Sequence, residues 1–116
     1  MFSRGDRIRK TLMKEISDII QRGIKDARIS GIVSVTDVDL SSDYKFAKVF
    51  VSVYGSEEAK EQTMDALHDA QPKVRYEIGK RIRLRNTPEI EFKRDDSIER
   101  GSKITDLINK ISRGEV

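Results

Sequence analysis

The chain has 116 residues, of which 37% are charged and 36% are hydrophobic, and it contains no cysteine. A chain of this length supports one hydrophobic core, and its evenly spread apolar residues are typical of a compact domain. The absence of cysteine excludes disulfide scaffolds, zinc ribbons, iron–sulfur clusters and thiol catalysis. Residues 1–10 lack the apolar core of a signal peptide, and no apolar run approaches the length of a membrane span. We therefore expect a soluble, cytoplasmic, single-domain protein without membrane partners.

The charges are unevenly distributed along the chain, although the formal net charge is only +3. Residues 4–28 carry eight basic and four acidic side chains, and residues 72–94 carry eight and three. Between these segments, residues 55–71 carry one basic and five acidic side chains. Two basic segments can form a positive surface for a polyanion, although charge runs are also common on ordinary solvated surfaces. The charge pattern alone leaves nucleic-acid binding and simple solubility both open.

The first predicted elements are a helix and a β-hairpin. A capping-box pattern at residues 3–6 is followed by isoleucine and leucine at helical spacing over residues 8–24. Residues 29–40 are rich in β-branched side chains and predict a strand, which a turn at residues 41–43 joins to a second strand. In the second strand, two sets of side chains alternate: Ala47, Val49, Val51 and Val53 against Phe46, Lys48, Phe50 and Ser52.

The second half of the chain predicts two more helices, a strand and a final helix. Ser56 is expected to cap a helix that Pro72 ends or kinks, so that a third helix begins there. Thr87-Pro88 is expected to end the third helix, and residues 90–92 alternate as a short strand. A last amphipathic helix would bury the apolar residues Ile104, Leu107, Ile108 and Ile111. The order α-β-β-α-α-β-α predicts an α+β fold, a three-stranded sheet with helices on one face.

The third predicted helix, from Lys73 to about Leu84, combines an apolar stripe with a basic face. The stripe has i, i+4, i+8 spacing and consists of Val74, Ile78 and Ile82. The opposite face carries cations and one aromatic ring, at Lys73, Tyr76, Lys80 and Arg83. Arg75 and Arg81 flank the stripe, and Arg85 follows. Cations and a ring on one rigid element suit phosphates and an unstacked base, so we favour RNA binding over a merely solvated face.

Candidates for catalysis are weak. His68 is the only histidine and lies in the acidic second helix, where an exposed position is expected. Asp37 and Asp39 fall on one side of a strand, as acids for a metal would, but solvent-facing residues beside a turn are the favoured interpretation. Gly79-Lys80 lacks the upstream glycine of a phosphate-binding loop. We expect no enzyme, no catalytic residue, no metal and no cofactor.

Several segments carry a resemblance to a known family. The most specific is Arg-Leu-Arg-Asn-Thr-Pro-Glu-Ile-Glu-Phe at residues 83–92, followed by Asp95 and Ser97. Earlier matches lie at residues 25–28, at residues 47–49, and in the first strand at Thr36, Val38 and Leu40. Over nearly its whole length the chain resembles the ribosome-binding factor A family of bacterial small-subunit assembly factors.

The resemblance implies a type II KH-like domain of order α-β-β-α-α-β over residues 1–116. It also implies binding to the 30S subunit late in its maturation, a role in 5′-end processing and folding of 16S rRNA, and growth in the cold. A ribosome-associated GTPase and initiation factor 3 would act in release. No two glycines lie three residues apart, so the Gly-x-x-Gly clamp of ordinary KH domains is missing. Pro72 stands where the family has the glycine of an Ala-x-Gly kink.

We therefore expect a monomeric, non-catalytic factor that contacts rRNA through its basic helix. The predicted RNA contacts on and after that helix are Lys73, Arg75, Tyr76, Lys80, Arg81, Arg83 and Arg85. If the first helix lies on the same face, it adds phosphate contacts from Arg4, Arg7, Arg9 and Lys10. The alternative is a protein-binding module that docks an acidic partner through the same helix. A metal-dependent nuclease using Asp37 and Asp39 ranks last.

Overall fold

The computed structural model describes residues 3–29 and 32–96. The chain begins with helix α1 (Arg4–Asp18) and a π-helical turn η1 (Ile19–Gly23), followed by strands β1 (Val33–Leu40) and β2 (Phe46–Val53). Helices α2 (Glu57–Asp69) and α3 (Gln71–Arg81) and strand β3 (Glu89–Arg94) complete it. The predicted order is confirmed through the third strand. The predicted final helix lies outside the described residues.

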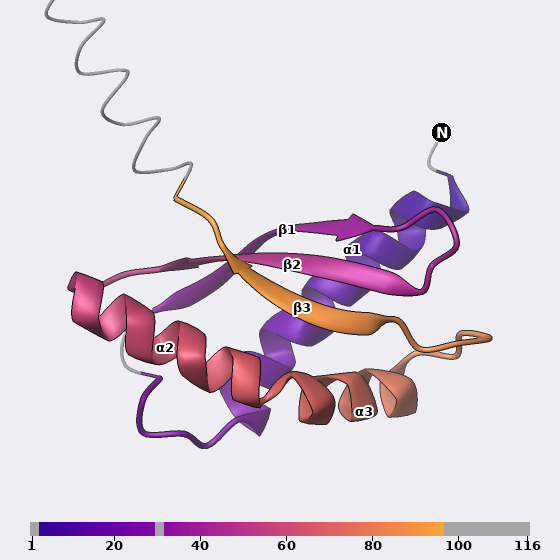
Figure 1. Cartoon of the computed structure of the whole chain (residues 1–116). Coiled ribbons are helices and arrows are strands. Elements are labelled where there is room, and N and C mark those ends of the chain that lie inside the picture. The colour runs from indigo at the N-terminus through magenta and orange to yellow at the C-terminus, as the bar shows by residue number, and fades with distance from the viewer. Residues whose placement is uncertain (1–2, 30–31, 97–116) are drawn as a thin grey trace, which may run out of the picture.

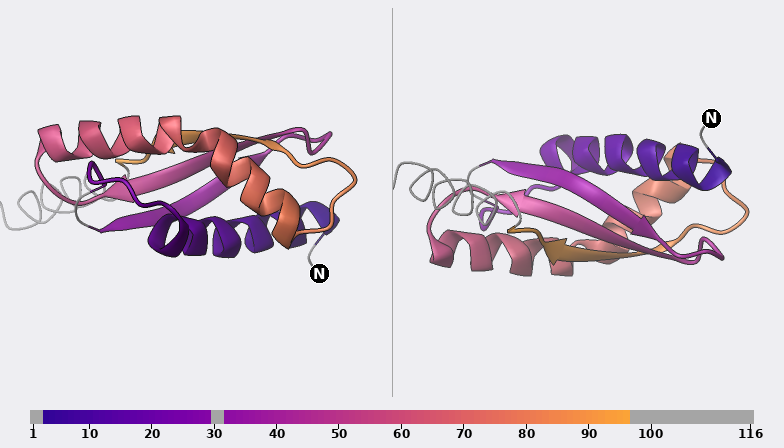
Figure 2. Two further views of the ribbon diagram at one scale, coloured as in Figure 1. Left: turned by 90° about the horizontal axis from the view of Figure 1, so that it is seen from below. Right: turned by 90° about the horizontal axis from the view of Figure 1, so that it is seen from above.

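The three strands form one sheet in the order β1-β2-β3. Strands β1 and β2 are antiparallel, whereas β3 runs parallel to β2 because the α2–α3 crossover carries the chain back (Figure 1). All three helices cover one face of the sheet, and the other face carries none of the described helices (Figure 2). The structure is thus the predicted α+β fold.

Local sequence signals account for most of the element ends. Ser3 and Asp6 make the reciprocal capping box of α1, and the Ser56 hydroxyl accepts the Ala59 N–H to cap α2. Between β2 and α2 the chain turns at Gly55, whose φ of 140° is rarely adopted by other residues. Ala70 separates α2 from α3, with Pro72 in the first turn of α3, where the missing proline N–H leaves no hydrogen bond unmade.

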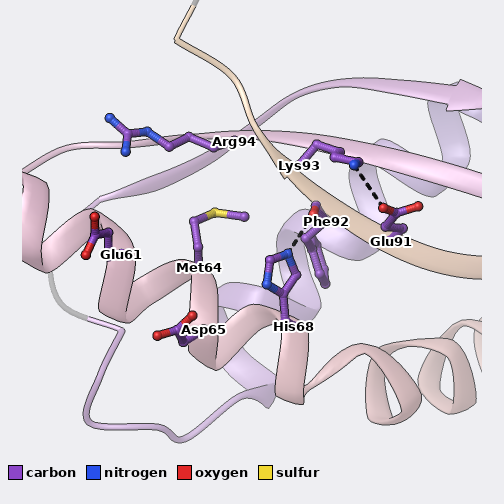
Figure 3. Close-up of a pocket in the computed structure, with 8 residues that line it drawn as sticks. All are labelled: Glu61, Met64, Asp65, His68, Glu91, Phe92, Lys93 and Arg94. Carbon is purple, nitrogen blue, oxygen red and sulfur yellow. Dashed lines mark hydrogen bonds and ion pairs between the residues drawn. The ribbon is translucent and has the colours of Figure 1, made fainter.

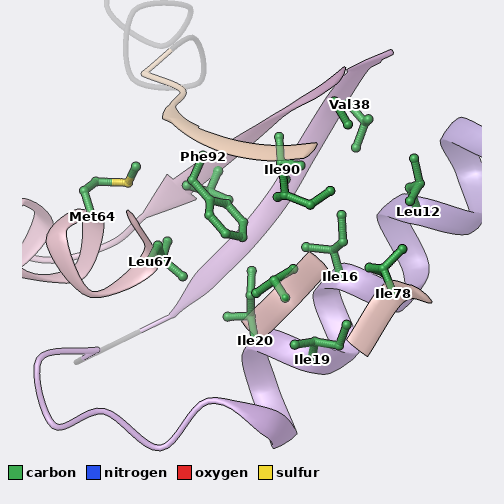
Figure 4. Packing of buried hydrophobic residues seen from close by; sticks show 14 of the residues in the cluster. Leu12, Ile16, Ile19, Ile20, Val38, Met64, Leu67, Ile78, Ile90 and Phe92 are labelled. Carbon is green, nitrogen blue, oxygen red and sulfur yellow. The ribbon is translucent and has the colours of Figure 1, made fainter. Parts of the chain in front are cut away.

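The core lies between the helices and the covered face of the sheet (Figure 4). Alternation in the strands directs every second side chain into it, so that Val49, Val51 and Phe92 are completely buried. Leu12 and Ile16 of α1 and Ile78 of α3 meet them from the helical layer. Full burial of a side chain of this size contributes roughly 1.5–3 kcal/mol. This core holds α1 and α3 side by side.

The predicted end of the third helix is wrong. The third helix does not extend to Leu84, and Thr87-Pro88 does not end it: α3 stops at Arg81, and Ile82 is extended (φ −120°, ψ 126°). Ile82 and Leu84 both pack against the core at a spacing of two, which only an extended chain permits. The first helix changes to a wider π turn at Ile19, and Ile24 is already extended. The first strand begins at Val33 rather than near residue 29.

Candidate nucleic-acid interface

Helix α3 separates an apolar face from a polar one as predicted. Val74 and Ile78 are fully buried, whereas Lys73, Tyr76 and Lys80 are exposed. The Tyr76 side chain is 66% exposed, and the Lys80 Nζ lies 4.9 Å from its ring centroid in a cation–π contact. Lys80 also lies 3.3 Å from the Glu77 carboxylate. One rigid helix therefore presents two cations and a ring to solvent.

Arg81, the last residue of α3, joins α3 to α1. Its guanidinium donates to the Asp18 carboxylate at 2.7 Å and to the Glu15 carboxylate at 3.1 Å. These two hydrogen bonds raise the pKa of Arg81, and the bond from Arg81 lowers the pKa of Asp18. With both carboxylates engaged, Arg81 acts as a clamp across the seam between the two helices, and its charge is already neutralised.

The other flank of α3 contacts the loop that follows it. The Arg75 guanidinium donates to the Thr87 carbonyl oxygen at 3.3 Å. A Cβ on Gly79 would lie 3.1 Å from the Thr87 hydroxyl, so the absence of a side chain lets the loop approach the helix. At the start of α3, Lys73 donates to the Gly23 carbonyl at 2.7 Å, at the end of η1. Both ends of α3 are thus tied to neighbouring segments.

The extended segment after α3 brings further cations to the same region. Leu84 is half-buried, so the side chains of Arg83 and Arg85 on either side of it are directed outwards and are exposed. Neither arginine forms an ion pair within the described parts of the chain. Arg85 lines a small hollow with Arg4 of α1. The start of α1 and the loop after α3 therefore meet.

Helix α1 does lie beside α3 in the same layer, as its predicted phosphate contacts require (Figure 2). Arg4, Arg7 and Lys10 are exposed. Arg9 is not directed with them: it is half-buried and forms an ion pair with Asp37 of β1 at 2.9 Å. We define the basic surface by eight exposed residues of these three segments, namely Arg4, Arg7, Lys10, Lys73, Tyr76, Lys80, Arg83 and Arg85.

Helix α2 is the acidic counterpart of this surface. A hollow of about 500 Å³ lies between α2 and β3, lined by Met64, Asp65 and His68 on one side and β3 on the other (Figure 3). His68 is exposed as predicted, yet its Nε2 donates to the Phe92 carbonyl at 2.9 Å (Figure 3). Gln71 accepts the Phe92 N–H at 3.0 Å. The side chains of His68 and Gln71 therefore form hydrogen bonds with main-chain groups on the outer edge of β3.

The predicted weak candidates for metal chemistry, Asp37 and Asp39, are exposed on β1. Asp37 is engaged by Arg9, and Asp39 lies opposite Lys48 in the strand register. Within residues 3–29 and 32–96, no three histidine or acidic side chains gather closely enough to hold a metal ion. None of the helices in the same ranges is long and apolar enough to cross a membrane.

Fold and surface together define a small α+β domain with a helical layer on one side of a three-stranded sheet, and a basic surface on that layer. A family model described as ribosome-binding factor A matches residues 4–108. The chain belongs to the ribosome-binding factor A family.

Individual relatives agree with this assignment. Ribosome-binding factor A of Clostridium botulinum (strain Okra / Type B1) is 49% identical over 112 residues, which cover 97% of this chain and 93% of the relative. The crystal structure of ribosome-binding factor A from Thermus thermophilus matches with a TM-score of 0.68 at 25% identity, over 80% of this chain and 97% of that one. A homology model of Thermus thermophilus ribosome-binding factor A, fitted into the cryo-EM map of its 30S complex, matches with a TM-score of 0.63 at 26% identity, over 76% of this chain and 91% of that one.

Sequence reasoning missed the partners of two predicted contact residues, Arg81 and Arg9. Their carboxylates lie 63 and 28 residues away in the chain, and no local pattern indicates such pairs. It also gave no role to Phe46, an exposed aromatic side chain. In this case the sequence did contain a signal, because strand alternation places Phe46 on the face opposite the buried valines.

Proposed function

We propose that this protein binds the 30S ribosomal subunit and assists late maturation of 16S rRNA without catalysis, using the basic surface to contact rRNA. The proposed role includes 5′-end processing and folding of that RNA and growth in the cold. A related protein has been fitted into a 30S complex, which supports the choice of partner. The domain is proposed to be a type II KH-like module, which binds RNA here without a Gly-x-x-Gly loop.

The observation that carries the proposal is a group of arginines without acidic partners. Arg4, Arg7, Arg83 and Arg85 are exposed and form no ion pair with any residue in the ranges 3–29 and 32–96. Other arginines of the same basic segments, such as Arg9 and Arg81, are held by carboxylates. Unpaired guanidinium groups on adjacent segments are suited to phosphate oxygens, to which they can donate in pairs.

The direct test is co-sedimentation of the purified protein with separated small and large subunits over a salt series. If about four cations neutralise phosphates, log K falls against log salt with a slope near −3. Binding to the small subunit alone, with that slope, is the expected result. Equal binding to both subunits would reduce the protein to a general polyanion binder.

Charge reversal locates the surface. Lys80→Glu combined with Arg83→Glu should abolish binding to the small subunit while the domain stays folded, because both side chains are exposed. A matched control reverses Lys48 and Lys93, two exposed cations on the strands, and should leave binding close to wild type. Retained binding by the folded Lys80/Arg83 variant would overturn the assignment of this surface.

The competing function is a module that docks an acidic protein through the same surface. It predicts that a complex captured from ribosomes survives nuclease treatment, whereas our proposal predicts its loss.

Incubation with precursor rRNA and Mg²⁺ or Mn²⁺ tests for a nuclease, and cleavage would contradict the non-catalytic role. The family resemblance extends the proposal to a cytoplasmic monomer whose release involves a ribosome-associated GTPase and initiation factor 3.

A further inference from the structure

A second hollow lies where the β-hairpin meets the loop after α3, beside the basic surface. It has a volume of about 340 Å³ and brings together the start of β2, the middle of α3 and the residues just before β3. We call it the hairpin notch. Its lining residues are Lys45, Phe46, Arg75, Asn86, Thr87 and Glu89.

The aromatic residue of the notch has an exposed side chain on a main chain that is held from both sides. Phe46 is 55% exposed, although it is the first residue of a strand at the centre of the sheet. Its N–H donates to the Ser41 hydroxyl at 3.0 Å, and its carbonyl accepts the Ser41 N–H at 2.9 Å. On the other side, Phe46 lies opposite Glu89 in the register with β3. An exposed phenylalanine costs free energy in water, so one that stands on an ordered main chain is suited to a flat partner.

The polar groups around the ring match the parts of a nucleotide. Lys45 and Arg75 supply positive charge for a phosphate, and neither forms an ion pair with a described residue. The Asn86 amide can both donate and accept, and the Glu89 carboxylate accepts from amino groups on a base edge. We propose that the hairpin notch binds a single unpaired RNA nucleotide, with its base stacked on Phe46. This inference rests on the proposed RNA-binding function and names the kind of RNA recognised.

Two features favour an unpaired nucleotide over the other partners of a basic surface. The bases of a double helix are already stacked and offer no face to a ring, so paired RNA would leave Phe46 unused. An acidic peptide would place its carboxylates beside Glu89 and be repelled.

Tyr76 is the alternative stacking ring, but Lys80 already lies over it. No comparable cation–π contact involves Phe46 in the part of the chain that the structure describes.

The test compares two fluorescein-labelled RNA hairpins, one with a bulged adenosine and one fully paired, by anisotropy with the purified full chain. Phe46→Leu should weaken binding of the bulged hairpin about five- to tenfold and leave the paired hairpin unchanged. Phe46→Trp should restore or raise the affinity, because tryptophan offers a larger stacking face. The matched control is Tyr54→Leu, since Tyr54 is 53% exposed just beyond the opposite end of β2, and it should change neither affinity.

The possible failures can be told apart. The nucleotide site is overturned if Phe46→Leu binds the bulged hairpin like wild type, or if it weakens both hairpins equally. It is also overturned if RNA affinities hold while co-sedimentation with the small subunit falls, because Phe46 then contacts protein. Failure of the proposed function itself has another signature: the Lys80/Arg83 reversal changes neither RNA nor subunit binding.

Discussion

Arg81 and Arg83 are two residues apart in sequence but lie in regions with different physical roles. Arg81 closes the seam between α1 and α3, where Asp18 and Glu15 neutralise it. Arg83 belongs to the extended segment beyond α3, where no carboxylate of the described chain pairs with it. A run of basic residues is therefore not one functional unit. Its members divide between those that hold helices together and those that remain available to a polyanion.

The seam depends most on its apolar contacts, so the largest expected effect is on stability. Ile78→Ala removes a fully buried side chain of α3 and should lower the free energy of unfolding by about 2–5 kcal/mol. Urea denaturation followed by circular dichroism measures it. Tyr76→Ala on the exposed side of the same helix is the control and should change stability by less than about 0.5 kcal/mol. Equal effects would show that α3 is not anchored by its apolar stripe.

The extended segment should behave in the opposite way. Replacing both Arg83 and Arg85 by alanine should leave stability almost unchanged, because both side chains are exposed. If each contacts one phosphate, the salt slope of subunit binding should become shallower by about 2, one for each lost contact. Co-sedimentation over a salt series measures the slope. An unchanged slope would remove both residues from the interface.

Arg81→Met separates the two roles within the basic run. It should leave the salt slope of binding unchanged and lower the midpoint of thermal unfolding, because Glu15 and Asp18 lose the cation that joins α3 to α1, and Asp18 keeps only its pair with Arg22 of η1. The pKa of Asp18 lies below its usual value in the folded state. The ionised Asp18 carboxylate therefore stabilises the fold at pH values above its pKa in the unfolded chain, and this stabilisation is lost as pH falls through its pKa in the folded protein. The difference between wild type and variant should therefore shrink at acidic pH. A difference that persists below the folded pKa would indicate lost packing instead of lost charge.

The sequence predicted those parts of the fold that local chemistry decides. The capping residues Ser3 and Ser56 and the alternation in β2 and β3 are local patterns, and the structure confirms each. The end of α3 was missed because helical spacing was extended to Ile82. The segment Arg81-Ile82-Arg83-Leu84-Arg85 alternates with a period of two, which indicates extended chain. The spacing of Ile82 and Leu84 therefore indicates that the helix ends before Ile82, as α3 does.

The candidate site was predictable only in part. Composition located the basic segments, and helical spacing placed Lys73, Tyr76 and Lys80 together on one face, as the structure has them. The engagement of Arg81 and Arg9 depends on which helix and strand lie beside them, and tertiary packing alone decides that. The same holds for the hairpin notch, whose residues come from three segments spread over positions 45–89.

The acidic side of the molecule offers the smallest and sharpest test of the same division. Arg28, in the loop after η1, donates to Asp26 at 2.7 Å and to Asp69 of α2 at 2.9 Å, as Arg81 does across the helical seam. Hydrogen bonds from Arg28 lower the pKa of Asp26 to about 2. Arg28→Gln should return this pKa towards 3.8, the ordinary value, which NMR titration of the Asp26 carboxyl measures. Because the folded pKa of Asp26 is depressed, the stabilisation that the Arg28–Asp26 pair contributes is full above about pH 4 and is lost as pH falls towards 2.

Arg22→Gln, at an arginine that is 81% exposed and paired with Asp18, is the matched control and should leave the pKa of Asp26 unchanged. An Asp26 that titrates near 3.8 in the wild-type protein would show that Arg28 is free in solution, and it would then belong with Arg83 among the available cations.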